Sequence, residues 1–214
     1  RPPTNDVADD DARKMLVPGF LAPFDLRRDA TWKTALECAF TRKSDLNEWE
    51  RQGPRINLED FRMETSSEGL LLQTPPQVHV ETRMYLWSRR CFEGDQWIEF
   101  DFRVESPRGL ALLVACASGM QREDFFADHG MPATGSMGTI LDDVRCYHWE
   151  FLRRVEAMRI DVETQYVAKN AVGVKLAGRC VPRLEQNRWY RLRFVKAGRR
   201  LHGSFDGQTV FDVK

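Results

Sequence analysis

Short runs of alternating apolar and polar residues follow one another along most of this chain. Residues 97–104, WIEFDFRV, alternate strictly, which is typical of a strand with one buried and one wet face, and residues 189–196 do the same. Residues 110–117, LALLVACA, are apolar on both faces, as expected of a central strand covered on both sides or of a strand whose small residues face a shallow groove. Two alternating runs at the C-terminal end flank Asp206-Gly207, a dipeptide typical of a tight hairpin. The pattern predicts antiparallel strands.

Further strands are predicted from short apolar runs that turn residues separate. They are expected at 35–40, at 70–72 after the turn 66–69, at 144–152 and at 158–168. Residues 121–129 are long enough for about two helical turns, and 130–138 are rich in glycine and proline, which predicts a loop.

This order of elements decides the fold class. Many short strands with few helices favour two antiparallel sheets packed face to face, because parallel sheets need helical crossovers that the pattern lacks. The 214 residues suit one such domain. We therefore predict an all-β, two-sheet jelly-roll sandwich over residues 36–214, with the polar residues 1–35 as an N-terminal arm packed on it.

Charge and hydropathy exclude two classes of partner. Lys and Arg total 32, as do Asp and Glu, so the formal net charge is zero and no global field attracts nucleic acid. No run approaches the roughly 18–20 apolar residues that cross a bilayer. We expect neither nucleic acid nor a membrane as a partner.

The five cysteines are widely spaced and form no C-x-x-C pair. This argues against a zinc site and against a disulfide scaffold, and most of these thiols are expected to be buried as small apolar groups. Because the sequence begins with Arg rather than Met, a mature form is expected, and a periplasmic or secreted location is favoured over the cytoplasm.

The candidate chemistry lies in residues 145–170. In a strand over 145–152, alternation puts Cys146, His148, Glu150 and Leu152 on one face. On the next strand, polar side chains at alternate positions form a row that is costly to bury dry, and we expect it to line a solvent-open hollow. The members of this row are Arg159, Asp161, Glu163 and Gln165.

Aromatic rings stack on the C–H faces of sugars, and planar polar groups bridge sugar hydroxyls, so this segment favours carbohydrate as the partner. The local excess of cations favours a sugar that carries carboxylate or sulfate. The residues predicted to bind it are Trp87, Arg145, Tyr147, Arg153, Arg154, Arg159, Asp161, Glu163, Gln165 and Asn170.

Each feature also has a simpler structural interpretation. His148 and Glu150 are a common structural pair, Arg153-Arg154 is compatible with a solvated strand end, and Trp87 and Trp149 suit core or rim packing.

Three segments carry a family resemblance: LWSRRCFEGDQWIEFDF, RCYHWEFLRR and MRIDVETQYVAKN. They resemble the YesU-like bacterial family of unknown function, within the concanavalin A-like lectin/glucanase superfamily, from about Leu36 to the end. The matching positions are Cys91, Phe92, Glu93, Gly94, Asp95, Tyr147, His148, Arg153 and Arg154.

The resemblance implies a galectin-like jelly roll encoded among genes for polysaccharide use. Related sandwiches include lectins, hydrolases and lyases, so membership does not choose among them. The E-x-D-x-x-E strand of the superfamily's glucanases is absent, which counts against a glucanase-like hydrolase. No cofactor is expected apart from a structural calcium ion that the superfamily implies, although Asp101, Asp206 and Asp212 form no ligand loop in the sequence.

Our leading hypothesis is a polysaccharide lyase acting on a uronate-containing glycan. Its base is His148 or Tyr166, Glu150 orients His148 or acts as the acid, and Lys169, with Arg145, Arg154, Gln165 and Asn170, neutralises the uronate carboxylate. The alternatives are a glycoside hydrolase that uses Glu150, Asp161 and Glu163, and a non-catalytic lectin in the same groove.

Overall fold

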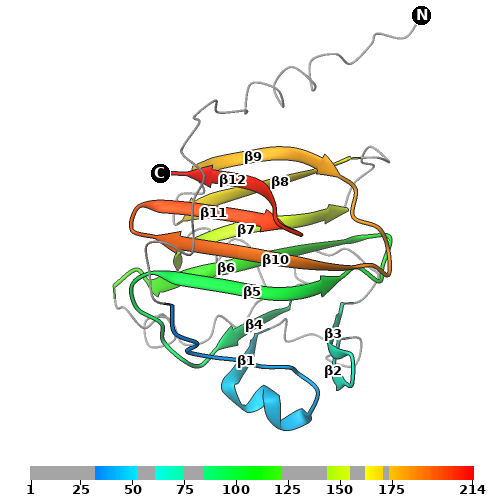
Figure 1. The fold of residues 1–214 in the computed structure, drawn as a ribbon. Coiled ribbons are helices and arrows are strands. Elements are labelled where there is room, and N and C mark those ends of the chain that lie inside the picture. Colours follow the sequence, from blue (N-terminus) through cyan, green and yellow to red (C-terminus); the bar gives the residue numbers. More distant parts are fainter. Residues whose placement is uncertain (1–31, 53–60, 75–83, 122–143, 155–161, 171–173) are drawn as a thin grey trace, which may run out of the picture.

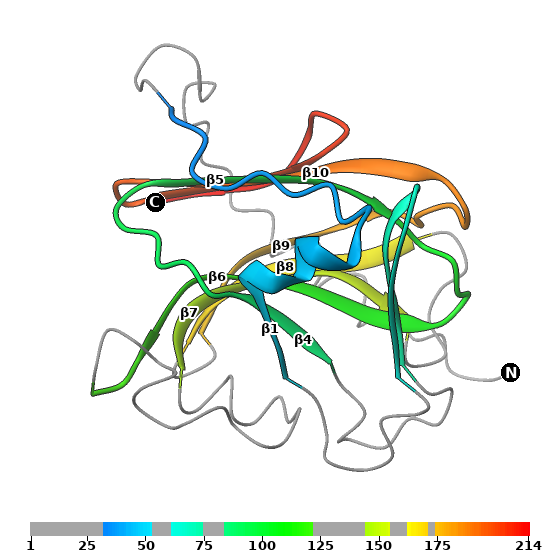
Figure 2. The same cartoon turned by 90° about the horizontal axis from the view of Figure 1, so that it is seen from below.

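The computed structural model describes residues 32–52, 61–74, 84–121, 144–154, 162–170 and 174–214, apart from the side chains of 162–164. Two four-stranded antiparallel sheets face each other, with strand orders β12-β11-β10-β5 and β6-β7-β8-β9 (Figures 1 and 2). Two short ribbons, β1-β4 and β2-β3, accompany them. The prediction of an all-β sandwich is confirmed.

The four ribbon strands precede the first strand of the first sheet. After a 3-10 helix, η1 (Lys43–Glu48), come β1 (Trp49–Gln52), β2 (Arg62–Ser66), β3 (Gly69–Gln73), β4 (Tyr85–Ser88) and β5 (Gln96–Arg103). The second sheet then follows as β6 (Gly109–Gly119), β7 (Val144–Arg154), β8 (Val162–Asn170) and β9 (Val174–Pro182), before β10 (Trp189–Ala197), β11 (Arg200–Phe205) and β12 (Gln208–Val213) return to the first.

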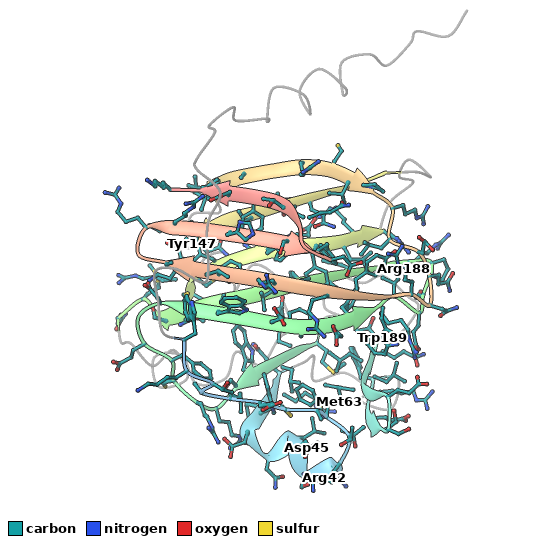
Figure 3. All side chains as sticks on the ribbon, viewed as in Figure 1. Arg42, Asp45, Met63, Tyr147, Arg188 and Trp189 are labelled. Carbon is teal, nitrogen blue, oxygen red and sulfur yellow. The ribbon has the colours of Figure 1, made fainter. Side chains whose placement is uncertain are left out.

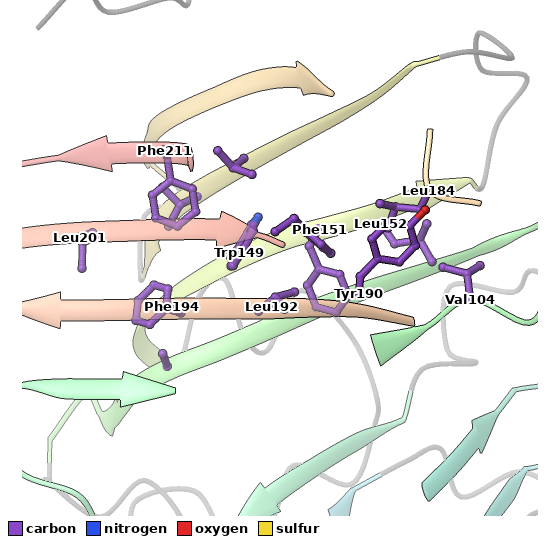
Figure 4. Close-up of a cluster of buried hydrophobic side chains, with 14 residues drawn as sticks. Val104, Trp149, Phe151, Leu152, Leu184, Tyr190, Leu192, Phe194, Leu201 and Phe211 are labelled. Atoms are coloured by element: carbon purple, nitrogen blue, oxygen red, sulfur yellow. The ribbon is translucent and has the colours of Figure 1, made fainter. Parts of the chain in front are cut away.

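The core fills the space between the two sheets (Figure 4). Tyr190, Leu192 and Phe194 of β10 point inward, opposite Trp149 and Phe151 of β7. Trp149 is fully buried, and the edges of its ring meet Phe205 and Phe211, with ring centroids 5.5 and 5.1 Å apart. The inward faces predicted for β5 and β10 are therefore confirmed, and Trp149 is a core residue, as its simpler interpretation required.

The C-terminal hairpin shows how local sequence sets a turn. Asp206 and Gly207 both adopt positive φ, 46° and 79°, between β11 and β12. Two successive residues of positive φ give the twist that a two-residue antiparallel hairpin needs, and glycine takes this conformation without steric penalty. The predicted hairpin is confirmed.

The β1-β4 ribbon covers part of the second sheet on the side away from the first (Figure 2). Tyr85 and Trp87 of β4 pack over Val144 and Cys146, together with the apolar side chains Leu112, Val114 and Ala117 of β6. This explains why β6 is apolar on both faces. β6 is nevertheless the terminal strand of its sheet rather than a central one, so the predicted covering is right and the predicted position is wrong.

Other predictions need correction. Residues 35–40 form no strand, and Phe40 there has a φ of 54°, which breaks an extended run. β1, β2, β4 and β9 were not predicted, and β9 lacks the strict alternation that would reveal it. The predicted helix at 121–129 and loop at 130–138 lie outside the described residues except for Gln121, and so does most of the arm at 1–35. No described helix is long and apolar enough to cross a membrane.

Candidate functional site

A polar cluster lies on the face of β7 and β8 that is turned away from the core. Directly opposed residues of antiparallel strands share a face, and the register pairs Glu150 with Tyr166 and Cys146 with Asn170. His148 lies between them on β7, because alternate residues of a strand point the same way. The structure thus brings together four residues predicted for the site: His148, Glu150, Tyr166 and Asn170.

Glu150 is the centre of one half of the cluster. Its carboxylate is 2% exposed and accepts a hydrogen bond from the Tyr166 hydroxyl at 2.9 Å. The Arg153 guanidinium donates to both carboxylate oxygens, at 3.3 and 3.4 Å. Glu150 therefore orients Tyr166, and not His148 as the sequence predicted.

His148 and Asn170 make the other half. Nδ1 of the imidazole lies 3.0 Å from the Asn170 amide nitrogen, which also donates to Cys146 Sγ at 3.5 Å. With this amide orientation Nδ1 accepts, and a neutral ring carries its proton on Nε2. Nε2 and the Asn170 Oδ1 are buried without a hydrogen-bond partner among the described residues. The cluster thus keeps a donor and an acceptor for a group that it does not itself contain.

Burial decides the protonation of the cluster. It lowers the pKa of His148, and the opposing effects of Glu150 and Asn170 do not restore it, so the imidazole is neutral at pH 7. Burial, then the charge of Glu150, raises the pKa of Tyr166 to about 12, and the phenol keeps its proton. Burial also raises the pKa of the Cys146 thiol to about 11, so this cysteine is no nucleophile.

A β-bulge places Arg153 beside Glu150. The register pairs Ala111 with Leu152 and Leu112 with Glu150, so Phe151 has no partner on β6. This extra residue reverses the alternation: Phe151 and Leu152 both enter the core, and Arg153 emerges on the same face as Glu150. The prediction that Leu152 shares the face of His148 is therefore wrong.

The same bulge removes Arg154 from the site. Arg154 is 5% exposed and donates to the backbone carbonyl of Leu184, a core residue. It is neither a solvated strand end nor a member of the polar cluster.

Other predicted residues lie on the core-facing side of the two strands. Gln165 shares that side with Val167 and is fully buried, and neither of its amide atoms has a hydrogen-bond partner within the described part of the chain. Tyr147 packs against the core cluster, Lys169 lies opposite it across the strand pair, and Arg145 is exposed. Because strand side chains alternate, these four residues do not share the face of His148, and their roles in binding stay predictions.

Trp87 of β4 packs against the same face of the second sheet as the cluster, and it is a packing residue. It is 7% exposed, stacks on Tyr85 with ring centroids 5.9 Å apart, and donates to Gln52 at 2.7 Å. Its simpler interpretation as core packing is supported over a sugar platform.

The rest of the predicted row cannot be placed beside the cluster. Arg159 and Asp161 lie outside the described residues, and so does the side chain of Glu163. The prediction that these side chains line a solvent-open hollow is wrong for His148, Glu150 and Asn170, which are only 2%, 2% and 3% exposed. Only the rim is open, since Tyr166 is half-buried and the Arg153 side chain is 37% exposed.

Lys175 of β9 is a neighbour of the cluster that sequence reasoning missed. Its ammonium lies 4.5 Å from the centroid of the Tyr166 ring. A single lysine within a strand gives no signal in the sequence, because the approach of Lys175 to Tyr166 depends on the pairing of β8 with β9.

The acids weighed for calcium are held by basic side chains. Asp101 pairs with Arg191, Asp206 with Arg188, and Asp212 with Arg200. In the described part of the chain, no three His, Cys, Asp or Glu residues gather as a metal site. A structural calcium ion stays a prediction without a ligand set.

Comparison with known proteins adds the fold and a family. A family model described as "Domain of unknown function (DUF1961)" matches residues 34–214. A crystal structure of a protein of unknown function with a galectin-like fold, from Bacillus subtilis, aligns with a TM-score of 0.68 at 22% identity, over 82% of this chain and 77% of that one. No curated protein matches the chain. The galectin-like fold and the likeness to a bacterial family of unknown function are confirmed.

Proposed function

The chain belongs to the DUF1961 family, whose description assigns no activity, and we propose from its geometry that it is a carbohydrate-active protein, a lyase on uronate-containing glycans. The observation that carries the proposal is the pairing of a proton-transfer couple, Tyr166 and Glu150, with a neutral buried imidazole whose Nε2 has no described partner. The galectin-like fold of the Bacillus subtilis protein supports carbohydrate as the class of ligand.

Elimination beside a uronate carboxylate needs a base, and Tyr166 with Glu150 supplies one. The phenol oxygen takes the proton from the carbon next to the carboxylate. The phenol proton passes along the hydrogen bond to Glu150, whose oxygen lies 2.9 Å from the phenol oxygen. A free phenolate is not required, which is consistent with the raised pKa of Tyr166. The carbon–oxygen bond to the leaving sugar then breaks, and its electron pair goes to the glycosidic oxygen. This oxygen takes the proton that the Tyr166 phenol holds, and Glu150 returns its proton to the phenol oxygen as the unsaturated product forms.

His148 and Asn170 serve the carboxylate. Removal of the proton places negative charge on the uronate carboxyl group, and a neutral Nε2–H donor in a buried site stabilises that charge without prior reorganisation. The sequence also predicted His148 as the base. For that role the Asn170 amide would have to be flipped, so that Nδ1 of His148 donates to it and Nε2 carries a lone pair. The contact of the amide nitrogen with Cys146 supports the donor role instead.

The test is the ultraviolet absorbance of the unsaturated product. Wild-type protein incubated with a polygalacturonate is expected to develop it, and Tyr166→Phe is expected to lose about 10²–10⁴-fold in kcat. Tyr147→Phe, on the other face of the neighbouring strand, is the matched control and keeps the wild-type rate. Cleavage of uronate polymers without absorbance, with oxygen from labelled water in the product, overturns elimination and selects a hydrolase.

One observation favours a second candidate, a non-catalytic lectin. In the resting protein Glu150 accepts from both Tyr166 and Arg153, so these polar groups are already satisfied as a set and need no turnover to explain them. A lectin would use the same cluster to bind sugar hydroxyls. Saccharide binding without turnover across a broad polysaccharide panel supports it over both enzymes.

A further inference from the structure

Two basic side chains reach the cluster face only because of β-bulges. On β7, the unpaired Phe151 brings Arg153 to the side of Glu150. On β9, the register pairs Ala177 with Val167 and Lys175 with Ala168, so Leu176 is the extra residue. Leu176 and Ala177 both pack against the core, and Lys175 emerges beside Tyr166. A bulge re-aims the side chains that follow it, and here two bulges aim cations at one place.

Gly178 makes room for the Lys175 side chain. It lies opposite Tyr166, and a Cβ built there would be 2.9 Å from Tyr166 Cβ and 3.4 Å from Lys175 Cε. The same Cβ would lie 2.9 Å from the backbone oxygen of Gln165, so glycine at this position lets β9 pair closely with β8 beside Tyr166 and the lysine stem. The cation–π contact at 4.5 Å holds the ammonium in place without neutralising it.

The charge of Lys175 is available for a ligand. Lys175 is exposed and forms an ion pair with no carboxylate of the described residues, whereas the arginines of the outer face of β5 and β10 are paired with acids. The Arg153 guanidinium donates to both oxygens of Glu150, and its side chain is 37% exposed, which places its positive charge at the rim of the cluster. Both cations lie next to Tyr166, the residue proposed to abstract the proton.

We propose that Arg153 and Lys175 form an anion-recognition pair that selects acidic over neutral saccharides at this site. The proposal rests on the proposed function and deepens it by assigning selectivity to Lys175, which lies outside the Tyr166–Glu150 couple. Carboxylate and sulfate share the chemistry that such a pair recognises, and uronate and sulfated sugars are the two sources.

The test compares affinities for three probes by calorimetry: a galacturonate trisaccharide, its carboxyl-reduced neutral form, and a sulfated galactose trisaccharide. Lys175→Met is expected to lose about tenfold in affinity for the acidic probe that the site prefers and to leave neutral binding unchanged. Lys175→Arg restores most of the loss. Lys169→Met removes an exposed lysine from the other face of β8 and is the matched control, with unchanged affinities.

The outcomes separate the two proposals. If the neutral probe binds as tightly as both acidic probes, or if Lys175→Met changes nothing, the anion-recognition pair is wrong and the carbohydrate site stands. If none of the probes binds and no polysaccharide is turned over, both fall.

Discussion

The outward faces of the two sheets handle charge in opposite ways. On the first sheet, the β5–β10 pair carries a cross-strand ladder in which Arg191 binds Asp101 and Glu99, and Arg193 binds Glu99. A tryptophan lies near each end of this ladder. Trp97 of β5 packs against the Arg193 guanidinium, and the exposed Trp189, at the start of β10, packs against the Arg103 guanidinium (Figure 3). On the second sheet, His148, Glu150 and Asn170 are almost completely buried.

The difference separates a solvated surface from a candidate site. In the ladder, water shares the solvation of each charge, so its ion pairs need no ligand to explain them. In the buried cluster, Nε2 of His148 and Oδ1 of Asn170 lack described partners, although burying an unpaired polar atom destabilises a fold. Such a violation of local stability rules is expected where function requires it.

The largest expected effect on stability comes from Glu150→Ala. It removes the acceptor of the half-buried Tyr166 hydroxyl and one acceptor of the Arg153 guanidinium, and we expect a loss of about 2–4 kcal/mol in the free energy of unfolding. Urea denaturation measures it. A loss below about 1 kcal/mol would show that the buried cluster behaves like a solvated surface.

The pH dependence of stability gives the next effect. Burial lowers the pKa of His148 below its ordinary 6.5, so below about pH 6.5 the unfolded chain binds more protons than the folded chain. The free energy of unfolding therefore falls as the pH is lowered through this window, by at most about 1.4 kcal/mol per pH unit for each histidine.

Substituting each histidine shows how much of the pH dependence of the free energy of unfolding it causes. His148→Gln is expected to reduce it. His202→Gln, on the first sheet, is the matched variant, because burial also lowers the pKa of His202 and each substitution should remove only its own share. Urea denaturation between pH 5 and pH 7.5 measures the slopes. An unchanged slope in His148→Gln would contradict the neutral imidazole.

The smallest effect is expected from the ladder. Glu99→Ala removes an acceptor of Arg191 and Arg193 with a 28% exposed side chain, and we expect a loss of at most about 1 kcal/mol, smaller still in 1 M salt. If Glu99→Ala destabilises the fold as much as Glu150→Ala does, the contrast between the two faces fails.

Strict alternation was enough to predict much of the sandwich. The inward sets of β5 and β10, the hairpin at Asp206-Gly207 and the shared face of His148 and Glu150 all follow from a period of two and from the turn preference of Asp-Gly. These features are local, so neighbouring residues suffice to determine them.

What the tertiary structure decided is where alternation fails. The bulges in β7 and β9 reverse the faces of Leu152, Arg153 and Lys175, and the pairing of β7 with β8 turns Gln165 and Lys169 away from the cluster. A bulge exists only relative to a partner strand, and its extra residue looks like any other in the sequence. For that reason the chain by itself determined a sandwich with a polar pair on β7, and strand pairing determined which cations stand beside it.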